Sequence, residues 1–467
     1  MISYAEWSPT GHQVAYVMHN DLYVCDLETQ SRITYDGSST VFNGIPDWVY
    51  EEEVLQRNYA LWWAPDSTHV AYMRFNETSV PEYRLQFYTT SNTSYPDEVS
   101  IKYPKPGAQN PLVSLHVYSL LNKTSIMITK NATSDGQAQT DGEHKDFEDH
   151  DRLITDVAWA TTTHTHLLFK QTNRVQDHEK TSLVEIANNT KISLVRDYKP
   201  TDGGWVDISQ TMTYLSTTHN GSVVKYLDIA EYNGFMHLAI YTVGQENDIR
   251  PTWLTQGEWE VIVGSVVVDK ERQLIIYSRL EQVDGRGTGY RGRKYKVGVR
   301  GRLGELEAMD QSYGGYLASK VVETNTGVFS TAMAVAPVSD WRYYDSIYTE
   351  RYMLMPESNA KGYNTSAVSN MTGFENTKYL LVHGTGDDNV HFQHSAVLLD
   401  KLTKASIHNY RFQMFTDSNH AMAYHEANQN LYYLLTNFLW ESFGGKEYMH
   451  IRQESFGHFS GSLDSIH

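Results

Sequence analysis

A serine, an aspartate and a histidine occur in an order that hydrolytic enzymes use. Ser312 lies in S-Y-G-G-Y, Asp387 lies in H-G-T-G-D-D-N, and His420 ends F-T-D-S-N-H. In a triad of these three types the serine attacks a carbonyl carbon, the histidine moves the proton, and the aspartate orients the imidazole. The chain order Ser, Asp, His therefore predicts acyl transfer, most simply hydrolysis.

Three consecutive carboxylates form a second chemical feature. Glu51, Glu52 and Glu53 follow the run D-W-V-Y. A run of like charges on a helix is commonly a solvated face. Crowded carboxylates repel each other, however, so a fixed cluster suits a cationic partner such as a substrate ammonium group. The residues alone leave both interpretations open.

Other ligand-binding patterns are weak. The Gly-rich run V-D-G-R-G-T-G-Y-R-G over residues 283–292 lacks the Lys-Ser/Thr of a phosphate-binding P-loop. The His, Cys and carboxylate residues do not show the spacing of a metal site. We therefore expect neither a metal nor another cofactor.

The elements of the N-terminal part repeat. W-S-P-T-G-H-Q-V-A-Y-V from Trp7 and W-A-P-D-S-T-H-V-A-Y-M from Trp63 each combine a Trp, a turn and an apolar strand, with weaker copies around Trp159, Trp205 and Val266. Such recurring turn-and-strand units are typical of β-propeller blades, and an ordinary β-sandwich is the alternative.

The pattern changes near Leu280, where strand-turn-helix sequences begin. An apolar strand before Asp387 and a Gly-rich turn after Ser312 favour an α/β-hydrolase sheet for this part. We therefore predict a truncated β-propeller over residues 1–280, an incomplete α/β-hydrolase domain over 281–445, and a polar tail over 446–467.

Composition limits the partners and the compartment. The 467 residues carry a net charge of −18, which disfavours nucleic acid and anionic membrane surfaces. Cys25 is the single cysteine, so no intrachain disulfide is expected, which is usual in the cytosol. The sequence nevertheless contains eight Asn-x-Ser/Thr sequons, which favour a glycosylated protein of the secretory pathway. They are Asn76, Asn92, Asn122, Asn131, Asn188, Asn220, Asn364 and Asn370.

Several long motifs in order resemble the dipeptidyl peptidase IV family of serine peptidases. They are D-W-V-Y-E-E-E (47–53), Y-P-K-P-G-A-Q-N-P (103–111), V-D-G-R-G-T-G-Y-R-G (283–292), A-P-V-S-D-W-R-Y-Y-D-S-I-Y-T-E-R-Y-M (336–353) and H-G-T-G-D-D-N-V-H-F (383–392). The resemblance runs from about Trp7 to about Trp440. It implies a peptidase without cofactor that releases X-Pro or X-Ala dipeptides from peptides with a free N-terminus, through an acyl-enzyme.

The resemblance also assigns roles to residues. Ser312, Asp387 and His420 are implied as the catalytic triad, with the Tyr313 backbone N–H as an oxyanion donor. Glu52 and Glu53 are implied to hold the substrate's amino terminus, so that only two residues reach the serine. The substrate-binding set also contains Val338, Trp341, Tyr344 and Tyr348 around the proline, and Arg351 and Asn389 at polar groups. Arg351 has an alternative as an interior ion-pair partner of Glu350 or Asp345.

The family pattern further implies the secretory pathway, with a vacuolar, cell-surface or secreted location. Family members often carry a membrane anchor, and we expect the natural chain to begin earlier. This sequence has no apolar stretch long enough to span a membrane. The pattern also allows a homodimer.

The sequence departs from the family at two sites. Near Arg279–Val283 and near Glu307–Ser312, intact motifs are joined without the connecting strands, and Asp310 stands where G-x-S-x-G has its first Gly. We interpret these as omitted exons or an incomplete gene model. The competing hypothesis is a catalytically inactive remnant that acts as an interaction protein. A lipase or esterase shares the triad but has no use for Glu52 and Glu53.

Overall fold

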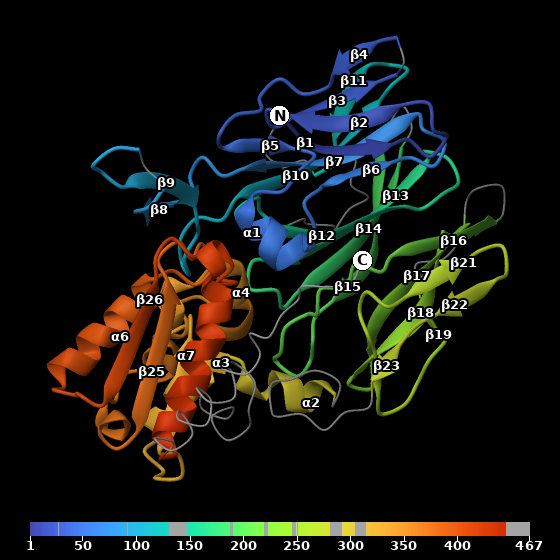
Figure 1. Ribbon diagram of the computed structural model, residues 1–467. Coiled ribbons are helices and arrows are strands. Elements are labelled where there is room, and N and C mark those ends of the chain that lie inside the picture. The colour runs from blue at the N-terminus through green and yellow to red at the C-terminus, as the bar shows by residue number, and fades with distance from the viewer. Residues whose placement is uncertain are drawn as a thin grey trace, which may run out of the picture. The chain divides into compact units, whose positions relative to one another are not determined.

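The computed structural model describes residues 1–26, 28–90, 92–129, 147–186, 190–218, 223–244, 249, 251–280, 292–303 and 314–444. These residues divide into two compact units (Figure 1). Unit 1 comprises residues 1–83, 102–306 and 345–363, and unit 2 comprises residues 84–101, 307–344 and 364–467. The short segments 84–101 and 345–363 thus belong to a different unit from their neighbours in sequence.

Unit 1 is built mainly of antiparallel sheets (Figure 1). The first contains β1 (Ile2–Trp7), β2 (Val14–Met18), β3 (Asp21–Cys25) and β4 (Gln30–Arg32). The second contains β5 (Val41–Asn43), β6 (Leu61–Trp63), β7 (His69–Asn76), β10 (Leu112–Ser119) and β11 (Thr124–Met127). The third contains β12 (Arg152–Trp159), β13 (His166–Asn173), β14 (Glu179–Glu185) and β15 (Lys191–Tyr198). The fourth contains β16 (Thr213–Thr218), β17 (Val223–Tyr232), β18 (Phe235–Val243) and β19 (Thr252–Trp253).

Smaller elements complete this part of the chain. Two strand pairs are β20 (Glu260–Val261) with β23 (Arg279–Leu280) and β21 (Val267–Asp269) with β22 (Leu274–Ile276). The helical segments of unit 1 are α1 (Trp48–Tyr50), the π-helical turn η1 (Glu51–Leu55), α2 (Arg293–Lys296), the 3₁₀ turn η3 (Val297–Val299) and α4 (Ser346–Met353). Helix α5 (Ala360–Ser366) and the hairpin of β8 (Glu82–Phe87) with β9 (Asp97–Lys102) each span a boundary between the units.

The repeated Trp motifs form turn-and-strand units, as predicted. Trp7, Trp63 and Trp159 are the last residues of β1, β6 and β12, and each is followed by a turn and the next strand. Around Trp205 the prediction is less accurate, because the strand there begins only at Thr213. The Val266 copy forms the β21–β22 hairpin.

Strand β13 shows how these sheets pack. Leu167 and Phe169 belong to one apolar cluster, whereas Leu168 between them belongs to another. Because successive strand residues face opposite sides, β13 is covered by apolar side chains on both faces. The third sheet therefore contributes to two layers of the core, as in stacked sheets.

Unit 2 contains a parallel sheet in the order β24 (Thr331–Val335), β25 (Lys378–Gly384), β26 (Tyr410–Phe415). The helices α3 (Gly314–Glu323), α6 (Gln393–Lys404) and α7 (Ala427–Ser442) lie around this sheet (Figure 1). Short 3₁₀ turns are η5 (Trp341–Tyr343), η6 (Thr372–Glu375) and η7 (Tyr424–Glu426).

Alternation along β25 explains the helix placement. Leu380 and Val382 pack in one cluster with Leu431 and Phe438 of α7. On the opposite face the Tyr379 hydroxyl lies 2.7 Å from the Ser319 hydroxyl of α3. Both faces of the strand are thus buried, as expected for a parallel sheet with crossover helices. This β-rich part followed by an α/β part agrees with the coarse fold prediction.

Three predicted features lie outside the described residues. They are residues 283–291 of the Gly-rich run, residues 304–313 with Ser312, and the tail over 446–467.

Candidate active site

The loops at one edge of the unit 2 sheet carry most of the predicted site. In a parallel sheet the carboxyl ends of all strands meet at one edge. Asp387 follows β25 and His420 follows β26, so the sheet brings these two side chains together. Val338, Trp341 and Tyr344 follow β24 at the same edge.

Asp387 and His420 form a hydrogen-bonded pair. The His420 Nδ1 atom lies 2.9 Å from Asp387 Oδ2, which confirms the expected approach of these two groups. Asp387 is fully buried, whereas about half of the His420 side chain is exposed. The imidazole is therefore held on one side by a buried carboxylate and is accessible on the other, which suits a general base.

Several donors surround the Asp387 carboxylate. Its Oδ1 atom accepts hydrogen bonds from the backbone N–H groups of Asn389 at 3.1 Å and Val390 at 2.9 Å. Burial raises the pKa of Asp387, but hydrogen bonds and charge interactions with His383 and His420 outweigh burial, so the pKa lies below its usual value. The carboxylate is therefore ionised at neutral pH, as an acceptor for an imidazolium must be.

Two glycines allow the Asp387 loop to approach the His420 loop. A Cβ atom on Gly384 would lie 2.2 Å from the Ser418 carbonyl oxygen, and one on Gly386 would lie 2.6 Å from the Asp417 carbonyl oxygen. The Gly386 N–H also donates to the Ser418 carbonyl at 3.1 Å. Backbone packing therefore requires glycine at both positions.

The predicted proline pocket residues in unit 2 pack together. The Trp341 and Tyr344 rings meet edge to face with centroids 5.9 Å apart, and both side chains are buried. The Tyr344 hydroxyl donates to Asn389 Oδ1 at 2.9 Å, which links this aromatic group to the Asp387 loop. Val338 is also buried.

The carboxylate cluster lies in unit 1. Glu51, Glu52 and Glu53 occupy the π-helical turn η1, where Glu51 and Glu52 are exposed and Glu53 is partly buried. Burial raises the pKa of Glu53; the Arg351 guanidinium opposes this shift and the Glu52 carboxylate adds to it. The triplet is therefore not simply a solvated helix face, since Glu53 is partly buried and its pKa is shifted by burial and by neighbouring charges.

Arg351 approaches this cluster from helix α4. Its Nε atom donates to Gln176 Oε1 at 2.5 Å and its Nη2 atom donates to the Glu53 carbonyl at 3.1 Å. The alternative partner Glu350 is wrong for Arg351, because Glu350 accepts from Arg174 at 2.5 and 2.7 Å.

The other alternative, Asp345, does interact with Arg351 by charge. Burial, and next the charge of Glu53, raise the pKa of Asp345 well above its usual value.

Of the remaining predicted residues, Tyr348 lies in α4 against the Tyr352 ring, with centroids 4.7 Å apart. Ser312 and Tyr313 lie outside the described residues.

Sequence reasoning missed three contributors. His383 contacts Asp387, Gly386 permits the close loop approach, and Asp417 binds the turn after β8. Only the glycine had a sequence signal, because a G-x-G directly before a polar loop residue indicates close backbone approach. The partners of His383 and Asp417 are set by tertiary contacts.

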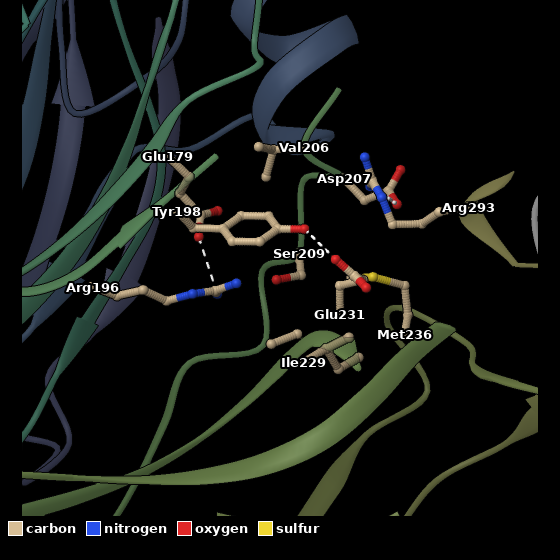
Figure 2. Close-up of a pocket in the computed structure, with 11 residues that line it drawn as sticks. Glu179, Arg196, Tyr198, Val206, Asp207, Ser209, Ile229, Glu231, Met236 and Arg293 are labelled. Carbon is tan, nitrogen blue, oxygen red and sulfur yellow. Dashed lines mark hydrogen bonds and ion pairs between the residues drawn. The ribbon is translucent and has the colours of Figure 1, made fainter. Parts of the chain in front are cut away.

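The charged residues between the third and fourth sheets of unit 1 form a separate cluster. The pocket drawn in Figure 2 lies there. Its volume of about 10 Å³ has room for about one water molecule. Its polar groups bond each other: Arg196 contacts Glu179 at 3.2 Å and the Tyr198 hydroxyl donates to Glu231 at 2.6 Å. This cavity is structural packing and is too small for a peptide.

Among the residues that the structure describes, there is neither a metal-binding cluster nor a membrane-spanning helix. Within the described ranges, no group of His, Cys and carboxylates could hold a metal ion. In the same ranges, no helix has the length and apolarity needed to cross a membrane.

Comparison with known proteins defines the class and then the family. Residues 306–446 match the prolyl oligopeptidase family, and residues 1–315 match the dipeptidyl peptidase IV N-terminal region. The chain is 32% identical to a protein of Aspergillus flavus named "Probable dipeptidyl peptidase 4", over 94% of this chain and 78% of that protein. It is 30% identical to the "Probable dipeptidyl-aminopeptidase B" of Podospora anserina, over 95% of this chain and 67% of that protein. The chain belongs to the dipeptidyl peptidase IV family of serine peptidases.

A solved structure supports the fold. The crystal structure of Porphyromonas gingivalis dipeptidyl peptidase 4 superposes with a TM-score of 0.74 at 22% identity, over 94% of this chain and 82% of that one. The alignment with the Aspergillus flavus protein extends over 624 positions, although this chain has 467 residues. The relative therefore carries internal segments that this chain lacks.

Proposed function

We propose that this chain is a serine exopeptidase that releases N-terminal X-Pro or X-Ala dipeptides from peptides. The observation that carries the proposal is the Asp387–His420 pair at 2.9 Å, on the loops after two neighbouring parallel strands. Membership of a dipeptidyl peptidase family supplies the reaction class.

The proposed reaction uses two acyl-transfer steps. Ser312 attacks the carbonyl after the second residue while His420 accepts its proton, and the Tyr313 N–H stabilises the oxyanion. His420 then returns the proton to the leaving amine. Water attacks the acyl-enzyme in the second step with His420 again as the base. The bond between the acyl carbon and Ser312 Oγ breaks, the dipeptide leaves, and His420 returns the proton to Ser312. Throughout, the Asp387 carboxylate stabilises the imidazolium without taking its proton.

Substrate selection is proposed to use the remaining residues. Glu52 and Glu53 bind the ammonium group of the peptide's first residue, which gives dipeptides as products. Arg351 and Asn389 bind polar groups of the substrate. The flat aromatic pocket suits a pyrrolidine ring and excludes larger side chains. Its residues are Val338, Trp341, Tyr344 and Tyr348.

Architecture and location follow as further parts of the proposal. We assign residues 1–280 to a truncated β-propeller and 281–445 to an α/β-hydrolase domain. The sequons support glycosylation and passage through the secretory pathway to the vacuole, the cell surface or the medium. A homodimer is also part of this proposal.

A turnover assay and a labelling assay together test the function. The 467-residue chain is incubated with an X-Pro chromogenic substrate and, separately, with a serine-reactive phosphonate, next to the Ser312→Ala variant. The proposal expects turnover and a phosphonate adduct at Ser312, both absent in the variant. Turnover that persists in Ser312→Ala would overturn the assignment of the nucleophile.

One observation favours a second candidate, a non-catalytic interaction protein. Asp310 replaces the small residue that a nucleophile elbow needs, and connecting segments present in relatives are missing. A folded chain that shows neither turnover nor a Ser312 adduct would support this second function.

A further inference from the structure

His383 is a fully buried residue that contacts the carboxylate of the candidate triad. It is near the end of β25, four residues before Asp387. Its Nε2 atom lies 2.7 Å from the Val390 carbonyl oxygen and 3.3 Å from Asp387 Oδ2. Both of these neighbours are acceptors, since Asp387 is ionised. The proton of the neutral ring must therefore reside on Nε2.

The other ring nitrogen fixes this tautomer. His383 Nδ1 lies 2.7 Å from the Ser395 hydroxyl of α6, which then acts as the donor. Ser395 is also fully buried. The ring is thus held at Nε2 by the loop after β25 and at Nδ1 by helix α6, and it packs edge to face against Phe392 with centroids 5.7 Å apart.

The Asp387 loop closes on this ring. Val390 accepts from His383 through its carbonyl and donates through its N–H to Asp387 Oδ1 at 2.9 Å. Oδ2, which accepts from His420, is the oxygen that faces His383. The backbone donors thus contact Oδ1, whereas the two histidines, His383 and His420, contact Oδ2.

We propose that His383 is a positioning residue that fixes the Asp387 carboxylate toward His420. The expected effect of His383 on turnover rests on the proposed function. The expected effect of His383 on the Asp387–His420 hydrogen bond does not. His383 touches no substrate and takes no part in proton transfer. It acts only through the placement of Oδ2.

Two amide variants separate the two ring nitrogens. His383→Gln retains a donor near the Nε2 position and loses the acceptor for Ser395. His383→Asn retains an acceptor near Nδ1 and loses the donor toward Val390 and Asp387. Both variants remove the ring, so damage from lost packing alone affects both alike.

The first measurement is the His420 Nδ1–H proton resonance in histidine-labelled protein, assigned with His420→Gln. The proposal expects a downfield resonance in the wild type that persists in His383→Gln and moves upfield or disappears in His383→Asn. The same response in both variants, or no response in either while the protein remains folded, would overturn the proposal.

The second measurement is dipeptide release as a function of pH. We expect kcat to fall about tenfold or more in His383→Asn, with KM little changed and the acid limb of the profile displaced, and His383→Gln to recover most of the activity. A resonance change in a chain without any turnover would support the role of His383 and contradict the proposed function. If His383→Asn had normal turnover and the pH profile changed only in His383→Gln, this result would contradict the role of His383.

Discussion

At the scale of single residues, the surroundings of a carboxylate decide its charge state. Glu51, Glu52 and Glu53 are equal in sequence, but Glu51 and Glu52 are exposed, whereas Glu53 is partly buried and interacts with Arg351. Asp387 is ionised although it is fully buried, because donors surround it. Identical side chains thus acquire different charge states from their surroundings.

The Glu53 carboxylate is expected to contribute to substrate affinity. Loss of one charge-assisted contact to an ammonium costs about 1.5–3 kcal/mol. Glu53→Gln should therefore reduce kcat/KM for an X-Pro substrate by about tenfold to a hundredfold. Glu51→Gln is the matched control and should change it little. Equal effects of the two variants on kcat/KM would contradict the special role of Glu53.

Asp156 predicts a pH dependence of stability. Burial, which outweighs the attraction of Lys170, raises the pKa of Asp156 to about 7. A raised pKa means that ionisation of Asp156 destabilises the folded state. This cost is absent below the unfolded pKa near 4, grows as the pH rises, and is complete above about 7. We expect Asp156→Asn to stabilise the protein at pH 8 relative to the wild type, and not at pH 4.

Denaturant unfolding at several pH values measures this difference. A stability difference between Asp156→Asn and the wild type that is constant from pH 4 to pH 8 would contradict the raised pKa.

At the scale of elements, a hairpin is attached to the loop that carries His420. Asp417 lies three residues before His420 and accepts from the Tyr88 N–H at 2.8 Å, the Thr89 N–H at 2.7 Å and the Thr89 hydroxyl at 2.5 Å. Tyr88 and Thr89 follow β8 directly. Phe87, the last residue of β8, also lies next to Gly386. The turn after β8 therefore supports both loops of the candidate pair.

Removal of the Asp417 hydrogen bonds to Tyr88 and Thr89 should make the β8–β9 hairpin less stable. Hydrogen bonds to a charged group contribute about 1.5–3 kcal/mol, so Asp417→Ala should destabilise unit 2 by about that amount. The amides of Tyr88 and Thr89 should then exchange hydrogen faster.

Asp400→Ala removes an exposed carboxylate that pairs with Lys404, so it is a suitable control and should cost less than about 1 kcal/mol. Unchanged amide hydrogen exchange at Tyr88 and Thr89 in Asp417→Ala would show that the Asp417 hydrogen bonds do not stabilise the hairpin.

At the scale of the whole molecule, the internal segments that relatives carry and this chain lacks are expected to limit its turnover. A displacement of the nucleophile by even 1 Å can cost about a hundredfold in rate. A variant with a strand and a G-x-S elbow inserted before Ser312 should therefore release dipeptides at least about a hundredfold faster than the chain as it stands. Equal rates for the two proteins would show that the missing segments are harmless.

The sequence by itself determined the class of the protein and most of its local structure. A continuous run of apolar residues before Asp387 predicted β25, the Trp repeats predicted the turn-and-strand units, and the order of Asp387 and His420 predicted their pairing. These features depend on local periodicity and on strand order, which are written in consecutive residues. The tertiary structure alone decided that Arg174, not Arg351, pairs with Glu350, that His383 contacts Asp387, and that Asp417 binds Thr89. Such contacts join residues far apart in the chain or depend on how a loop closes, so their partners are fixed only when the chain has folded.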